Sequence, residues 1–141
     1  MGLLDRLRDR HRDRRGPALT VDSPGLVVVA EAFDPAEADS AALARAHAWA
    51  RERPAVLRHH LTLPEASVER AATLLAQDGW ELRPDPARTD GWHATRVQAL
   101  DALHCAQERS RMAGLAQRLG GDSAGWDALQ PAANQPDRPA G

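Results

Sequence analysis

The stretch RHHLTLPEA contains two adjacent histidines, His59 and His60, which are the residues that most clearly suggest a chemical role. Imidazole side chains bind transition metals and act as general bases near neutral pH. Neighbouring residues on a β-strand point to opposite faces, so a strand here would separate the two rings. One ion could not easily be held by both rings, and the pair is a poor metal motif.

The alternation around the pair predicts where each ring lies. The residues in phase with His59 are three leucines, Leu57, Leu61 and Leu63. The residues in phase with His60 are polar, Arg58 and Thr62. We therefore expect His59 to be buried with a hydrogen-bond partner, and His60 to be more exposed, either solvated or part of a contact surface.

The remaining residue types offer little catalytic chemistry. Cys105 follows His104, but neighbouring positions on a helix diverge by about 100°, so the two do not form a nucleophile–base dyad. We expect Cys105 to be a small buried residue. The other histidines, at positions 11, 47, 93 and 104, show no spacing that indicates a metal. With no phosphate loop or nucleophile elbow in the sequence, we expect no catalytic, cofactor-binding or metal-binding residues and no enzyme activity.

The helices and strands that hold these residues are predicted from the periodicity of apolar residues and from the glycine, proline and capping residues at their ends. Strands are predicted at residues 26–30, 55–63, 80–83 and 92–99. Helices are predicted from the capping sequence at Asp34 to Arg53, over residues 65–77, and over residues 101–119, with Leu103 among the inward positions of the last one. The order β-α-β-α-β-β-α favours an α/β (α+β) two-layer sandwich, with a mostly antiparallel sheet and helices on one face. A ferredoxin-like core with a further strand fits residues 55–119 best.

Composition bounds the class of protein. The chain has 141 residues, which is a one-domain length, and a formal net charge of −2, which gives no overall argument for nucleic acid. Residues 1–16 carry a local charge of +3 and are predicted to be a basic arm, residues 17–130 are predicted to form a single domain, and residues 131–141 are predicted to be a disordered tail. A single cysteine, no apolar run of membrane-spanning length and no secretory signal predict a cytoplasmic protein.

Three short motifs resemble the RraB-type regulators of ribonuclease E activity. They are His59-His60-Leu61, the stretch Asp78-Gly79-Trp80-Glu81-Leu82, and Gly120-Gly121 followed by Gly125-Trp126-Asp127. The resemblance spans roughly residues 36–130, although Ser123 and Ala124 replace the usual Tyr-Asp of the family. It implies a non-enzymatic protein that binds a ribonuclease-E-type enzyme, or its RNA-decay assembly, and inhibits or modulates RNA cleavage.

Two hypotheses for the binding surface remain open at this point. In the first, a protein partner contacts the polar sheet face and Trp126, although Trp126 is also read as a structural plug after the last helix. In the second, the chain is an RNA-binding module with an open basic sheet face. Its contacts would come from Arg58, His60, Trp92 and Arg96, if the later strand presents Trp92 and Arg96 on that face.

Overall fold

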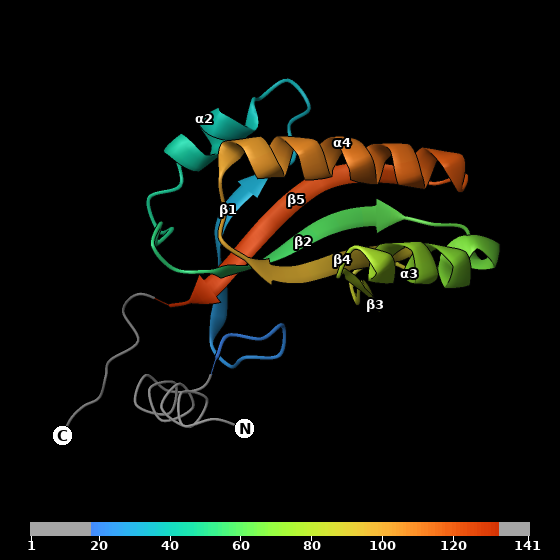
Figure 1. The fold of residues 1–141 in the computed structure, drawn as a ribbon, viewed down its shortest axis with the longest axis horizontal. Helices are drawn as coiled ribbons and strands as arrows, with labels where there is room; N and C mark the ends of the chain where they lie inside the picture. Colours follow the sequence, from blue (N-terminus) through green and yellow to red (C-terminus); the bar gives the residue numbers. More distant parts are fainter. Residues whose placement is uncertain (1–17, 133–141) are drawn as a thin grey trace, which may run out of the picture.

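The computed structural model describes residues 18–132. The basic arm at residues 1–16 and residues 133–141 of the predicted tail lie outside this range. The described chain forms one five-stranded sheet in the order β1-β5-β2-β4-β3, in which every neighbouring pair is antiparallel (Figure 1). In that order, the strands are Leu26–Ala32 (β1), Asp122–Pro131 (β5), Ala55–Thr62 (β2), Gly91–Gln98 (β4) and Glu81–Pro84 (β3).

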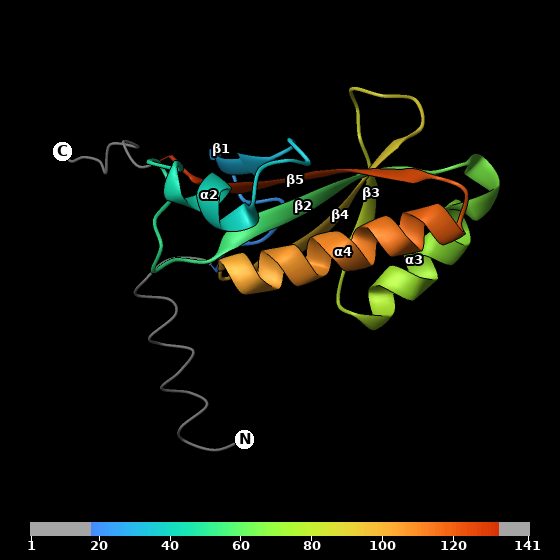
Figure 2. The same ribbon diagram turned by 90° about the horizontal axis from the view of Figure 1, so that it is seen from above.

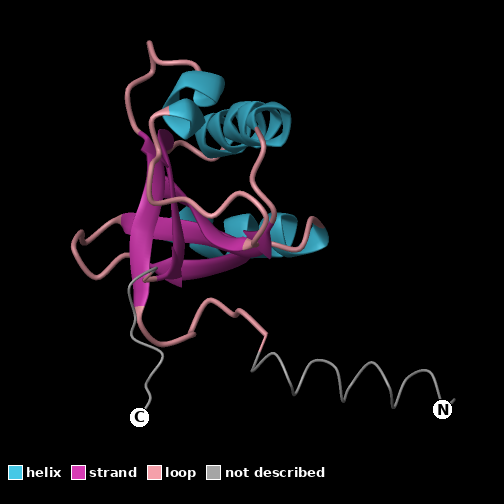
Figure 3. Ribbon diagram, turned by 90° about the vertical axis from the view of Figure 1, so that its left-hand side faces the viewer, coloured by secondary structure: helices cyan, strands magenta, loops and turns pink. Residues whose placement is uncertain are grey.

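The helices cover one face of the sheet. They are Asp39–Ala44 (α2), the short 3-10 turn Glu65–Ser67 (η1) with Val68–Gln77 (α3), and Ala102–Arg118 (α4). Figures 2 and 3 show α2, α3 and α4 on the same side, while the loop between β3 and β4 projects on the other. The predicted two-layer α+β sandwich is therefore confirmed.

The ferredoxin-like description of the core stays a prediction. From β2 onward the elements follow the order β-α-β-β-α-β, and their strands lie in the order β5-β2-β4-β3. Within residues 18–132, no helix has the length and apolar composition that a membrane span requires.

The core lies between the sheet and the helix layer. Leu57, Leu61, Trp126 and Ala128 face it from the central strands, and Met112 meets them from α4; each is at most 1 % exposed. Burial of this apolar surface is the main force that holds the two layers together. Leu103, expected to point inward, is 64 % exposed, so that position of the predicted apolar stripe is wrong.

The first predicted helix is much shorter than expected. Asp34 accepts a hydrogen bond from the Ala36 amide, but this closes a turn, and α2 begins at Asp39. The stretch that was expected to continue the helix is bound by Gln130 of β5. The Gln130 amide accepts from the Ala50 amide at 2.9 Å and donates to the carbonyls of Ala50, Arg53 and Pro54. These backbone groups satisfy their hydrogen bonds outside a helix, so the helical pattern is overridden.

The largest omission of the sequence-based prediction is β5. The residues after α4 were interpreted as a turn and the start of a tail, whereas they form a strand between β1 and β2. The strand also includes Pro131, which pairs with Leu26 and was assigned to the tail. Three glycines and a proline within and before this stretch obscured its strand pattern.

Candidate functional site

The sheet face opposite the helices, called the open face below, carries most of the polar side chains of the central strands. Arg58 pairs with Thr95 and His60 pairs with His93 in the register of β2 and β4. Directly paired residues of antiparallel strands point to the same face. As predicted, His59 points away from this face and is fully buried, while the His60 side chain keeps 17 % of its surface exposed.

Trp92 and Arg96 do not lie on the open face, and the premise that they share it with Arg58 is wrong. Trp92 pairs with Leu61 and Arg96 pairs with Leu57, both core residues on the helix side. Arg96 stacks over the Trp80 ring at 4.1 Å and binds Glu108 of α4 at 2.6 Å. Arg96 therefore ties the sheet to the helix layer.

Trp126 is a structural residue in this fold. Its side chain is fully buried opposite His59, and its indole Nε1 donates to Asp39 Oδ1 at 3.0 Å. A direct contact between Trp126 and a partner is ruled out by this burial. Its interpretation as a structural plug is correct, although it fills the core from a central strand and not from a turn.

Asp127 is the centre of the polar cluster on the open face. Its carboxylate accepts two hydrogen bonds from Arg58, at 2.8 and 2.6 Å, and lies 3.0 Å from His60 Nε2. Burial raises the pKa of Asp127, but the bonds from Arg58 and His60 outweigh it and hold the pKa at about 2. An ionised carboxylate only accepts hydrogen bonds, so His60 donates through Nε2.

His93 extends the cluster across the sheet. Its ring centroid lies 4.4 Å from that of His60, whose other side meets the edge of Phe33 at 5.0 Å. His93 Nε2 lies 3.4 Å from Asp85 Oδ2 in the loop after β3 but makes no hydrogen bond. Burial, with smaller effects from the charges of His60 and Arg58, lowers the pKa of His93.

Asp85 is held in place by its own loop. Its Oδ1 accepts from the Ala87 amide at 2.9 Å, and its Oδ2 accepts from Arg88 Nε at 3.3 Å. The Ala87 amide is the main reason that the pKa of Asp85 is lowered. The carboxylate is therefore ionised and points toward the two histidines at neutral pH.

His59 is chemically isolated from this cluster. Neither of its ring nitrogens has a hydrogen-bond partner, so the predicted partner is absent among the described residues. The ring instead meets Trp80 edge-on, with centroids 5.1 Å apart. Burial and then the charge of Arg96 lower the pKa of His59 to about 3, so the ring is neutral at pH 7.

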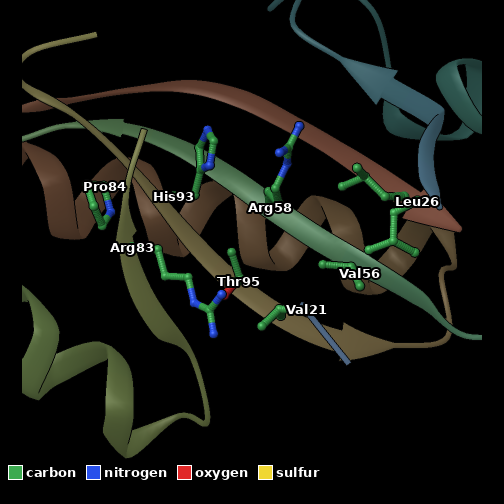
Figure 4. Close-up of a pocket in the computed structure, with 9 residues that line it drawn as sticks. Val21, Leu26, Val56, Arg58, Arg83, Pro84, His93 and Thr95 are labelled. Atoms are coloured by element: carbon green, nitrogen blue, oxygen red, sulfur yellow. The ribbon is translucent and has the colours of Figure 1, made fainter. Parts of the chain in front are cut away.

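A shallow depression of about 150 Å³ adjoins the cluster on the open face. Figure 4 shows Arg58 and His93 at its rim, on adjacent strands and on the side of the sheet away from α4. The segment before β1 contributes Val21 to its lining and is tied to β3, since Asp22 binds Arg83 at 2.6 Å. The depression is too small and open for a drug-sized ligand.

Cys105 is buried, as predicted, and shows no sign of activation. Burial raises the pKa of its thiol to about 12, so it carries no thiolate at neutral pH. The neighbouring His104 is an exposed residue whose Nδ1 lies 2.6 Å from Asp101 Oδ2 at the start of α4. The two side chains therefore do not act together.

The sequence-based prediction identified Arg58 and His60 but missed the partners that complete the cluster. His93 and Asp85 approach His60 only through the pairing of β2 with β4, which spacing along the chain does not reveal. Asp127 was noted only as part of a family motif. Comparisons of the chain with protein-family models, with curated proteins and with solved structures found no match.

Proposed function

We propose that this chain is a non-enzymatic regulatory protein of the cytoplasm. Its partner is a ribonuclease-E-type enzyme or a protein of the RNA-decay assembly around it, and binding inhibits or modulates RNA cleavage. The open face, with Arg58 and His60, supplies the contact surface. Trp126 contributes by holding the central strands in place, not by contact.

The observation that carries the proposal is the pairing of the two family-like motifs. His59 lies directly opposite Trp126, and His60 lies directly opposite Gly125, on the adjacent strands β2 and β5. Residues more than sixty positions apart in the sequence thus form one structural unit. Short motifs that occur by chance in a sequence have no reason to meet in this way, which supports the resemblance to the RraB-type regulators.

The open face has features of a protein-binding surface. Val28 of β1 and Phe33 just after it are exposed apolar side chains, 45 % and 40 % exposed. They flank the polar cluster of Arg58, His60 and Asp127, in which the charges already neutralise one another. Apolar anchors beside satisfied polar groups are typical of protein interfaces.

The alternative function, RNA binding on a basic sheet face, has lost its main support. Its stacking residue Trp92 and its Arg96 lie on the helix side of the sheet. Arg58 and Arg83, which do lie on the open face, are each engaged by carboxylates of Asp127 and Asp22. Phosphate groups would have to compete with these pairs.

The test is an RNA-cleavage assay with the ribonuclease of the same host, titrated with this protein. We expect cleavage to fall as the protein is added and a complex to appear by calorimetry, with little loss at raised salt. Unchanged cleavage with no complex would contradict the proposal. Strongly salt-dependent binding to single-stranded RNA alone would favour the RNA-binding alternative instead.

A further inference from the structure

Three side chains on the open face are arranged as a metal site. Ligand atoms of His60, Asp85 and His93 all lie within 4.8 Å of one another. We infer that these residues bind a divalent transition metal ion of the zinc type. This site is independent of the proposed ribonuclease partner, because it rests only on the geometry of the cluster.

The strongest support for an ion at this site is the unpaired ring nitrogen of His93. The residue is only 8 % exposed, and its Nε2 has no hydrogen-bond partner. A buried polar atom without a partner is unfavourable, and a metal ion is one of the few groups that would satisfy it.

The spacing of the donors fits a zinc-type ion. With bonds of about 2.0–2.1 Å, two donors on a tetrahedral zinc ion lie roughly 3.4 Å apart. His93 Nε2 and Asp85 Oδ2 are separated by 3.4 Å. His60 completes the set from the neighbouring strand, with a ligand atom within 4.8 Å of those of the other two residues.

A carboxylate already supports His60 as it supports many metal-binding histidines. Asp127 accepts a hydrogen bond from the Nε2–H group of His60, which leaves the lone pair of Nδ1 as the one available to an ion. Arg58 in turn fixes Asp127 through two hydrogen bonds. The outer partner of the ligand is therefore in place before any ion arrives.

The types of ligand at the site determine which kind of ion it favours. Two imidazoles and one carboxylate favour zinc, cobalt or nickel over the oxygen-binding ions magnesium and calcium. Arg58 and Arg88 are the cations beside the site; Arg88, whose side chain is 38 % exposed, can keep its hydrogen bond to Asp85 Oδ2 through the second lone pair of that oxygen when an ion binds. Three protein ligands leave a fourth position for water or for a donor from another molecule.

The experiment uses the full chain without a polyhistidine tag, at about pH 7.5, because metal ions compete with protons for their ligands and bind more weakly in acid. Zinc binding is measured by calorimetry, and cobalt binding by visible absorption, because low-coordinate cobalt gives intense bands that octahedral aqueous cobalt does not. We expect one ion per chain, with intense cobalt bands. Asp85→Asn and His93→Gln, which nearly preserve side-chain volume, should each weaken binding at least about tenfold.

The matched control is His47→Gln, since His47 is an exposed histidine away from the cluster. It should bind zinc and cobalt as the unaltered chain does. Circular dichroism shows whether each variant is folded, and Asp85→Asn, which replaces one carboxylate oxygen in the loop after β3 with an amide group, decides the result if His93→Gln does not fold. Absence of binding by the unaltered chain, or equal binding by Asp85→Asn and His47→Gln, would overturn the inference.

Discussion

His60 and His93 lie directly opposite each other on β2 and β4, with ring centroids 4.4 Å apart, although a helix and a strand separate them in sequence. Their pairing changes the meaning of the adjacent histidines. The side chains of His59 and His60 point to opposite faces of the sheet, as expected. The two histidine rings that lie close enough to act together are those of His60 and His93. The polar cluster therefore lies on the open face, and the apolar core lies on the helix face.

Gly125 should tolerate no side chain. Its φ of +116° is unfavourable for other residues, and a Cβ there would lie 2.2 Å from the carbonyl oxygen of Ala32. Gly125→Ala should therefore destabilise the fold by about 2–4 kcal/mol, since both strain and a backbone clash arise. Urea unfolding followed by circular dichroism measures the change.

Gly114 provides the control for that substitution. It lies within α4, where an added Cβ meets only Arg118 at 3.7 Å. Gly114→Ala should stabilise the protein by roughly 0.5–1 kcal/mol. Alanine has fewer accessible backbone conformations than glycine in the unfolded chain, so less conformational entropy is lost when the helix forms. If both variants changed stability equally, the close approach of β5 to β1 would be wrong.

The ion pair of Arg58 with Asp127 should couple more strongly than its exposed counterpart. Asp127 is nearly buried and accepts two bonds from Arg58, whereas Arg83 and Asp22 form a similar pair with side chains 36 % and 73 % exposed. Double-mutant cycles to alanine should give a coupling of about 2 kcal/mol for the first pair and a clearly smaller coupling for the second, which solvent screens. Comparable values would show that solvent screens both pairs equally.

His59 should make the fold sensitive to acid. Its pKa is about 3 in the folded protein, below the ordinary value of 6.5, because burial opposes its charge. As pH falls below about 6.5, the unfolded chain takes up a proton that folded His59 does not, so stability is lost progressively down to about pH 3. From pH 7 to pH 4 this loss amounts to up to about 3 kcal/mol.

His59→Leu tests this origin of the acid sensitivity. The variant should keep its stability at pH 7 within about 1 kcal/mol, since the ring makes no hydrogen bonds, and should lose less stability between pH 7 and pH 4. His47→Gln, at an exposed histidine, should behave like the unaltered chain. Parallel pH curves for all three proteins would assign the acid sensitivity to other groups.

The sequence predicted the parts of the fold that depend on local pattern. The alternation of leucines around His59 placed β2 and its two faces correctly, and the helical spacing of α3 and most of α4 was confirmed. The failures lie where distant residues decide. Gln130 holds the segment after α2 out of a helix, and β5 is stabilised by its position between two strands more than by its own composition.

The candidate site was predictable only in part for the same reason. Arg58 and His60 share a strand, so their common face follows from alternation. Which residues of β4 meet them depends on strand register, and a shift by one residue exchanges the two faces. The assignment of Trp92 and Arg96 to the open face was such an error, and it concealed His93.

Val28 should be an anchor of the partner surface. It is an exposed apolar residue of β1 on the open face, opposite Leu129, whereas Leu103 is a more exposed apolar residue on α4, on the other side of the molecule. Val28→Glu puts a charge that must be desolvated into the proposed interface, and Leu103→Glu puts the same charge outside it. Neither change removes a buried contact, so both variants should fold with stabilities within about 0.5 kcal/mol of the parent.

In the cleavage assay, Val28→Glu should weaken inhibition by at least tenfold, which corresponds to roughly 1.4 kcal/mol of binding free energy and is the scale of a modest interface anchor. Leu103→Glu should inhibit as the parent does. Calorimetric titration with the ribonuclease separates loss of binding from loss of inhibition in a complex that still forms. If Leu103→Glu were the variant that lost binding, the partner would dock on the helix layer, and the open face would be left to the metal site alone.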